Sequence, residues 1–264
     1  MSFFSGFGVL VEKFINFPAK RVPMGGFVLV DGMDGSGKGV IMDSYREWAK
    51  EKSLKVLELK DYCLEKGDLP EPEEIAEYDV IISEEPTYGR IGREIVDEMI
   101  ASNKREYSVF STSWAFALDR EILYNRVIIP ALKLNKLIIQ ERGVLTSLVY
   151  QPVQGRITLR ELMEMPGNRL ALKYAPNLLL VTKVDPKVVI ERLQVDNRIG
   201  QAIFHTLNFQ RTIEERYNST WLKGLFERFS TRIVYVDTNP PKSVEETKLE
   251  ARKILDEFLA EKKQ

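Results

Sequence analysis

The sequence predicts an α/β fold, in which a parallel sheet is covered by helices on both faces. Short apolar runs alternate along the chain with segments of helical periodicity, and this alternation is typical of parallel strands connected by helices. A glycine-rich loop lies between the first apolar run and the first helical segment. Polar residues follow several of the runs directly, and ligands of such sheets bind beyond the carboxyl ends of the strands.

The expected strands are short apolar runs that end in polar or turn-forming residues. They cover residues 27–30, 55–59, 79–83, 136–140, 177–182 and 232–236. Helical periodicity predicts helices over residues 40–52, 91–102, 113–129, 131–134, 186–193 and 243–259. Two helix starts are marked, because Asp185 precedes Pro186 and because Ser243 with Glu246 forms a capping box. The acidic segment 65–78 contains two prolines and is predicted to be a surface excursion.

Length and composition indicate one sizeable globular domain. The chain has 264 residues, of which 44% are hydrophobic and 29% charged, and we assign the domain to residues 26–264. The net charge of −1 argues against a basic nucleic-acid-binding protein, so no nucleic-acid partner is expected. Cys63 is the only cysteine and His205 the only histidine, which excludes an intrachain disulfide and a cysteine-rich metal site. The single cysteine favours a reducing, cytoplasmic location.

Residues 1–25 form an apolar extension that we expect to be helical. Phe3, Phe7, Leu10 and Phe14 recur at helical spacing and would form one apolar face. The extension lacks a basic start and is interrupted by charged residues, so neither a signal peptide nor a membrane span is expected. We expect the face to pack on the domain or on a partner subunit, with attachment to a membrane surface as the alternative.

The glycine-rich loop has the spacing of a phosphate-binding P-loop, G-x-x-x-x-G-K, formed by Gly32, Gly37 and Lys38. Glycines allow consecutive backbone amides to point into one concavity at the positive end of the following helix. Lys38 would neutralise the β- and γ-phosphates of a nucleotide. The expected nucleotide-binding residues are Gly32, Asp34, Gly35, Ser36, Gly37, Lys38 and Gly39.

Gly39 departs from the P-loop pattern, which ends in Ser or Thr. The hydroxyl at that position binds the Mg²⁺ of the nucleotide in P-loop proteins. The loop is therefore expected to bind phosphate while lacking a usual metal ligand.

Several motifs resemble those of thymidylate kinases, in order and in spacing. The loop from Asp31 to Lys38 matches DGxDGSGK, and residues 116–120 match the signature Phe-Ala-x-Asp-Arg. The turn at residues 84–87 echoes Arg-Glu-Pro-Gly-Gly, and the resemblance covers roughly residues 26–260. It implies a P-loop kinase fold with a central parallel five-stranded sheet, ATP and Mg²⁺ as cofactors, dTMP as acceptor and a homodimer.

The resemblance also implies roles for individual side chains. Phe116 would stack on thymine and Arg120 would bond a base oxygen, although Phe116 could instead be a core aromatic. Val96 stands where an acceptor-phosphate Arg is often found, and Arg93, one turn earlier, could serve the same face. The residues expected to bind the acceptor are Asp34, Glu85, Arg93, Phe116, Arg120, Arg142, Ser147, Tyr150 and Gln151.

Lys38, Arg142 and lid arginines such as Arg198 would supply positive charge for phosphoryl transfer. Glu141 stands in place of the family's Asp before Arg142 and would hold Mg²⁺ directly or through water. The lid is expected at about residues 192–216, although its arginines could equally be solvated helix charges.

Three functions are compatible with these residues. A nucleoside monophosphate presents phosphate oxygens that are already deprotonated, so transfer of a phosphoryl group from ATP to dTMP needs positioning and charge neutralisation. A deoxynucleoside kinase, with Glu141 close to the acceptor hydroxyl, is the first alternative. The second is a nucleotide-binding protein with little turnover, because Gly39 and Glu141 both depart from the family near the metal.

Overall fold

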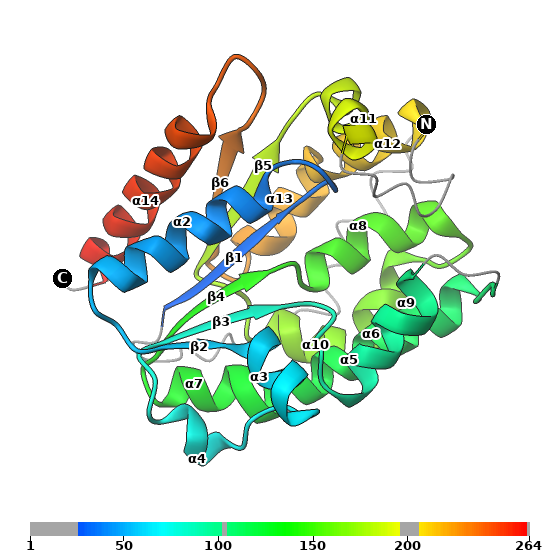
Figure 1. Ribbon diagram of the computed structural model, residues 1–264. Coiled ribbons are helices and arrows are strands. Elements are labelled where there is room, and N and C mark those ends of the chain that lie inside the picture. The colour runs from blue at the N-terminus through cyan, green and yellow to red at the C-terminus, as the bar shows by residue number, and fades with distance from the viewer. Residues whose placement is uncertain (1–25, 102–104, 196–205, 263–264) are drawn as a thin grey trace.

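A six-stranded parallel sheet forms the centre of the molecule (Figure 1). The computed structural model describes residues 26–101, 105–195 and 206–262. The strand order is β2-β3-β4-β1-β5-β6. The strands are β1 (Phe27–Gly32), β2 (Val56–Glu58), β3 (Val80–Glu84), β4 (Leu137–Glu141), β5 (Leu178–Lys183) and β6 (Arg232–Asp237). The sheet thus has six strands rather than the five that the resemblance implies, because all six apolar runs form strands and the short β2 adds an edge beside β3.

The order of the strands reverses beside β1. Strands β2, β3 and β4 lie on one side of β1, and the later strands β5 and β6 lie on its other side. Val30 of β1 is in register with Glu141 of β4, and Glu141 is in register with Glu84 of β3. The carboxyl ends of these three strands therefore lie side by side, at the place where α/β sheets bind ligands.

Helices cover both faces of the sheet (Figure 1). On one face, α2 (Lys38–Glu51) packs against α14 (Val244–Glu261). The opposite face carries a larger layer that includes α6 (Val109–Leu123), α8 (Val144–Gln154) and α10 (Pro166–Lys173).

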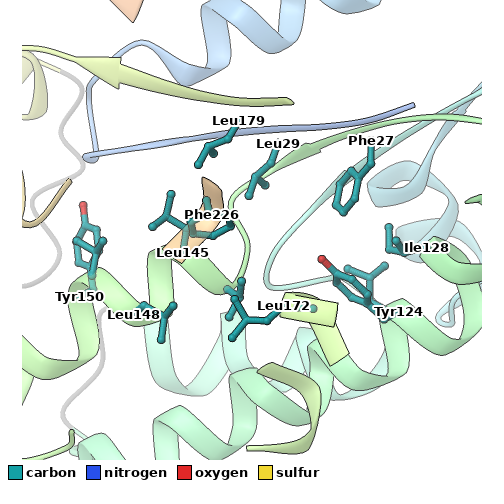
Figure 2. Close-up of a cluster of buried hydrophobic side chains, with 14 of the residues drawn as sticks. Phe27, Leu29, Tyr124, Ile128, Leu145, Leu148, Tyr150, Leu172, Leu179 and Phe226 are labelled. Carbon is teal, nitrogen blue, oxygen red and sulfur yellow. The ribbon is translucent and has the colours of Figure 1, made fainter. Parts of the chain in front are cut away.

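The alternation of side chains along β1 supplies both cores. Val28 and Val30 belong to the cluster beneath α2 and α14. Phe27 and Leu29 belong to the larger cluster on the other face, and Figure 2 shows both pointing into it. The ring of Phe27 meets that of Tyr124 edge-on, with 6.3 Å between their centres. β1 is buried along its whole length and is therefore a rigid support for the loop that follows it.

The remaining helical elements are connections and outer layers. They are α3 (Leu59–Lys66), α4 (Pro72–Ile75), α5 (Arg90–Glu94), the π-helical η1 (Ile95–Ile100) and η2 (Tyr124–Ile128), α7 (Ile129–Lys133), α9 (Leu159–Glu164), α11 (Pro186–Val195), α12 (Leu207–Tyr217) and α13 (Thr220–Glu227). Both marked helix starts are confirmed, since Ser243 and Glu246 form the capping box and Asp185 accepts a 2.7 Å hydrogen bond from the Lys187 amide.

Several elements differ from the sequence prediction. The helix expected over residues 113–129 begins at Val109 and changes to π geometry at Tyr124, and Pro130 lies inside α7 instead of interrupting the helix. The second strand stops at Glu58, because the buried Leu59 begins α3. Segment 65–78 is not only a surface excursion, since it forms α4 and buries Leu69 and Ile75 in the larger core. The helix expected over residues 91–102 begins at Arg90 and changes to π geometry at Ile95.

Other expectations lie outside the described residues. These are the helix of extension 1–25 and the position of Arg198. Among the described helices, none has the length and apolar character needed to cross a bilayer.

Candidate functional site

The P-loop leaves β1 in a conformation that depends on glycine. Gly32, Gly35 and Gly37 have φ angles of 148°, 69° and 89°, which side-chain-bearing residues rarely adopt. A Cβ atom at Gly32 would also collide with the side chain of Thr182 on β5. Helix α2 begins immediately afterwards at Lys38, so its free amides face the loop. This geometry suits a phosphate group.

Lys38 is buried inside the loop, with 4% of its surface exposed. Its Nζ donates hydrogen bonds to the carbonyl oxygens of Met33 at 2.8 Å and Gly32 at 3.3 Å. Burial, together with nearby Arg142 and against the opposing effect of Asp34, lowers the pKa of Lys38 to about 8. A phosphate beside Nζ would favour the charged form.

Residues distant in the sequence hold the loop in place. The hydroxyl oxygens of Ser36 and Thr182 lie 2.5 Å apart, and Thr238 Oγ1 donates to the Ser36 carbonyl at 2.8 Å. Arg192 of α11 donates to the carbonyls of Gly35 at 3.1 Å and Thr238 at 2.7 Å. Arg192 lies in the predicted lid region, and the structure places its guanidinium against the P-loop.

A buried carboxylate at the end of β1 ties two helices to the loop. Asp31 Oδ1 accepts hydrogen bonds from Tyr217 of α12 at 2.8 Å, from Thr146 of α8 at 2.8 Å and from the Gly32 amide at 2.7 Å. Burial raises the pKa of Asp31, while Arg142 and these donors oppose the change. No local pattern predicts the roles of Thr146 and Tyr217, because each lies more than a hundred residues from Asp31 along the chain.

Arg142 brings a second cation to the P-loop. Its φ of 61° is left-handed, and its amide donates to the Val30 carbonyl at 2.9 Å. Its guanidinium pairs with Asp34, whose amide donates to the Tyr150 hydroxyl at 3.2 Å. Burial opposes the charge on Arg142, but Asp34 and the neighbouring groups outweigh it and raise the pKa. The predicted residues Lys38, Asp34 and Arg142 therefore meet at one place.

A cleft of about 830 Å³ opens above the ends of β1, β4, β3 and β2. Such a volume suits a nucleotide-sized ligand. Its lining contains these members of the predicted set: Asp34, Gly35, Gly37, Lys38, Gly39, Glu85, Glu141 and Arg142. It also contains side chains to which the sequence analysis gave no role, among them Lys60, Glu84, Tyr88, Ile100 and Glu191. Lys60 follows the second strand closely, so inspecting the end of that strand would have found it.

Arg120 is the centre of a buried network behind this cleft, with 1% of its surface exposed. Its Nε donates to Glu85 Oε2 at 2.7 Å, its Nη2 donates to Ser147 Oγ at 3.1 Å, and its Nη1 donates to Asn168. Gln140 donates to the other oxygen of Glu85 at 3.0 Å. Burial raises the pKa of Glu85 to about 7 against the opposing effect of Arg120. Glu85 reaches the cleft wall, whereas Arg120 and Ser147 are not part of its lining.

The other predicted acceptor residues are placed differently. Phe116 is half-buried on α6, one turn before Arg120. Tyr150 and Gln151 are buried on α8, and Gln151 Oε1 has no partner among the described residues. Arg93 is exposed, pairs with Asp97 at 2.6 Å and does not line the cleft, so the structure does not bring it to the site.

Two carboxylates of the cleft, Asp34 and Glu141, are the candidates for a metal ion. The described residues contain no group of three or more side chains suited to bind a metal alone. A Cβ atom on Gly39 would have no atom within 4 Å, so the position that usually carries the metal-binding hydroxyl is open.

Comparison with known proteins agrees with this geometry. A sequence model described as thymidylate kinase matches residues 73–249. The chain is 27% identical over 220 residues to thymidylate kinase of Geobacillus sp. (strain WCH70), covering 82% of this chain and 90% of that protein. It is 28% identical over 236 residues to the probable thymidylate kinase of Archaeoglobus fulgidus, covering 89% and 97%.

The fold is similar to that of a solved structure, thymidylate kinase from Ehrlichia chaffeensis. The TM-score is 0.59 at 16% sequence identity, covering 89% of this chain and 99% of that chain. Since the family's sequence model spans more than half of the residues, the chain belongs to the thymidylate kinase family.

Proposed function

We propose that this protein transfers the γ-phosphoryl group of ATP to dTMP, forming ADP and dTDP. The observation that carries the proposal is the cleft in which Lys38 and Arg142 lie at the P-loop end and Glu85 and Tyr88 lie on the far wall. One end suits the phosphates of ATP, and the other leaves room for an acceptor. Family membership supports the same reaction.

The chemistry needs positioning and positive charge rather than a base. An oxygen of the dTMP phosphate forms a bond to the γ-phosphorus of ATP as the bond from that phosphorus to the ADP oxygen breaks. The attacking oxygen carries no proton at neutral pH, because the second pKa of a phosphate monoester is about 6. Lys38 and Arg142 stabilise the negative charge on the transferred group. Arg198 is proposed to add a further charge from the lid.

The acceptor base is proposed to contact α6, where Phe116 is only half-buried. Arg120 donates hydrogen bonds to Glu85, Asn168 and Ser147 and forms a further ion-pair contact with Glu85 through Nη2. It is 1% exposed and does not line the cleft, so it supports the acceptor site from behind. We propose stacking on the base for Phe116, and the contact from Arg120 to a base oxygen is kept as the role that the resemblance implies.

Mg²⁺ is proposed to accompany ATP. It is commonly bound by one or two carboxylates together with phosphate oxygens and waters, and the cleft supplies Asp34 and Glu141. Bound there, the ion would neutralise charge on the β- and γ-phosphates.

We further propose a homodimer in the cytoplasm. Phe110, Trp114 and Leu118 are spaced by four residues on α6 and are 52%, 44% and 46% exposed. An exposed apolar stripe of this kind marks an interaction surface. The buried free thiol of Cys63 agrees with a reducing compartment.

An ATP-consumption assay tests the reaction. The acceptors are dTMP, dUMP, dCMP, thymidine and none, each with Mg²⁺ and with Mn²⁺. We expect ADP formation to depend on dTMP and to exceed that with the other acceptors. A preference for thymidine would favour the deoxynucleoside kinase instead, and ATP binding without turnover for every acceptor would favour the nucleotide-binding protein.

A further inference from the structure

The wall of the cleft opposite the P-loop carries a lysine with an ordered polar environment. Lys60 Nζ lies 3.0 Å from Glu84 Oε1 and donates to the Tyr88 hydroxyl at 3.0 Å. It also lies 4.2 Å from the centre of the Tyr88 ring. All three residues line the cleft, and the Lys60 side chain is 43% exposed.

This arrangement leaves hydrogen-bond donors for a ligand. An ammonium group has three N–H donors, and the contacts described here use two of them. The Tyr88 oxygen accepts from Lys60, so the Tyr88 O–H can donate elsewhere. A ligand oxygen placed between the two side chains could therefore accept from both.

The other cations that line the cleft lie at the P-loop end. Lys38 is bonded to carbonyls of the loop, Arg142 to Asp34, and Arg192 to carbonyls beside the loop. These groups surround the place for the phosphates of ATP.

The wall near Lys60 is otherwise poor in positive charge. The side chains that η1 contributes to the lining are apolar, namely Val96 and Ile100. An acceptor monophosphate brings a charge of about −1.5 to −2 at pH 7 and needs a cation on its own side of the cleft. Among the described residues of the lining, Lys60 is the cation on that side.

We propose that Lys60, assisted by Tyr88, binds the phosphate of the acceptor nucleotide. The inference rests on the proposed function in requiring a nucleoside monophosphate as acceptor, but it does not depend on the base. Lys60 follows the edge strand β2 and lies outside residues 73–249, which the family model matches. The acceptor site would thus be completed by a cation from α3, the helix that follows the edge strand β2.

The neighbours of Lys60 place it at the carboxyl edge of the sheet. Lys60 lies on α3, directly after β2, and its Nζ lies 3.0 Å from Glu84 at the end of β3. Glu84 is in register with Glu141 of β4, the residue before Arg142.

Replacement of Lys60 by Met tests the proposal. We expect Lys60→Met to raise the KM for the acceptor monophosphate at least about tenfold, as for loss of a charged hydrogen bond, while the KM for ATP stays within about twofold. Lys60→Arg should recover part of the loss, because it keeps the charge.

Lys55 offers a matched control at the other end of β2. Its Nζ lies 2.9 Å from Glu77 and 5.0 Å from the ring centre of Tyr78, so it also has a carboxylate and an aromatic ring as neighbours, away from the cleft. Lys55→Met should lose a similar ion pair without changing the KM for either substrate. Equal changes in acceptor KM for the two variants would overturn the proposal.

Calorimetric binding separates this inference from the proposed function. The deoxynucleoside monophosphate that binds most tightly, chosen from dAMP, dCMP, dGMP, dTMP and dUMP, is compared with its nucleoside. We expect Lys60→Met to weaken the monophosphate but not the nucleoside. Unchanged binding of the monophosphate, or equal loss of both ligands, would refute the role of Lys60. Absence of turnover with tight monophosphate binding would refute only the proposed reaction.

Discussion

Lys38 is the residue on which nucleotide binding depends most directly. Its ammonium is buried beside the loop carbonyls and is the charged side chain at the start of α2. We expect Lys38→Ala to reduce ATP affinity or turnover at least about tenfold, because a charge-assisted contact to phosphate is lost. Titration calorimetry with ATP and steady-state kinetics measure the effect. Unchanged ATP binding would remove the basis for the P-loop assignment.

The lowered pKa of Lys38 predicts a proton linkage. Because the pKa of Lys38 in the folded protein is about 8, the side chain is neutral in more than half of the molecules above that pH. Phosphate favours the charged form, so ATP binding near pH 8.5 should take up a proton, and affinity should fall as the pH rises. Calorimetry in buffers of different ionisation enthalpy measures this uptake. Lys38→Arg serves as the control and should show none from this position, since arginine stays charged.

The glycine at position 39 predicts that adding a hydroxyl there changes the Mg²⁺ dependence of the rate. Gly39→Ser would place a hydroxyl at the first turn of α2, where a side chain meets no other atom within 4 Å. We expect the Mg²⁺ concentration for half-maximal rate to fall about tenfold, equivalent to a ligand worth about 1.4 kcal/mol. Gly39→Ala is the matched control, because it improves helix propensity without adding a ligand. The same metal dependence in both variants would show that the missing hydroxyl does not limit the metal site.

Replacement of Phe116 tests whether its ring binds the acceptor base or packs in the core. We expect Phe116→Ala to weaken dTMP binding by about 1–3 kcal/mol, a typical loss of stacking, with ATP binding nearly unchanged. Phe116→Tyr should retain most of the affinity. If both nucleotides were weakened equally, a core role for the ring would be the better interpretation.

The helix α6 is tied to the end of β3 by two neighbouring residues. Arg120 pairs with Glu85 at 2.6 Å, and Asp119 accepts hydrogen bonds from the Thr87 amide at 2.8 Å and from its hydroxyl at 2.6 Å. The turn after β3 and the helix that carries Phe116 are therefore one rigid unit.

Loss of Arg120 should destabilise this unit. We expect Arg120→Met to lower the free energy of unfolding by about 3–5 kcal/mol near neutral pH, because it leaves the buried Glu85 carboxylate unpaired. Burial already raises the pKa of Glu85 to about 7, so protonation relieves the unpaired charge and the loss should shrink as the pH falls. Chemical denaturation at pH 8 and pH 5 measures it.

The exposed pair of Arg93 and Asp97 provides the comparison, with side chains 48% and 50% exposed. Arg93→Met should change stability by less than about 0.5 kcal/mol, as is usual for surface positions. It should also leave the acceptor KM unchanged, because Arg93 does not line the cleft. If Arg93→Met raised the KM for the acceptor, Arg93 would have to be counted among the acceptor-binding residues.

Elements were predictable where a local pattern determines them. The six strands and the cap of α14 follow from apolar runs and from Ser243 with Glu246, and both are present. The π-helical η1 and the burial of Leu69 and Ile75 depend on packing partners elsewhere in the chain. The P-loop could likewise be predicted from the spacing of Gly32, Gly37 and Lys38. The burial of Arg120, in contrast, depends on side chains 27 to 48 residues away.

At the scale of the whole molecule, the stripe on α6 predicts association. The chain has a mass of 30.4 kDa, so we expect light scattering to give about twice that value. Trp114→Glu should shift the mass toward the monomer, because it places a charge in an apolar contact. Leu249→Glu on α14, at a residue that is 66% exposed, is the control and should leave the mass unchanged. A monomeric parent protein would contradict the dimer.

The supports of the P-loop have a consequence for synthesis of the protein on the ribosome. β1 emerges early, but its neighbours β4 and β5 and the braces Thr182, Tyr217 and Thr238 follow more than a hundred residues later. A nascent chain that ends before β5 contains the complete P-loop sequence and β4, but it lacks the contacts from Thr182, Tyr217 and Thr238. Competence to bind ATP should therefore arise late in translation, after β6 has left the exit tunnel and joined the sheet.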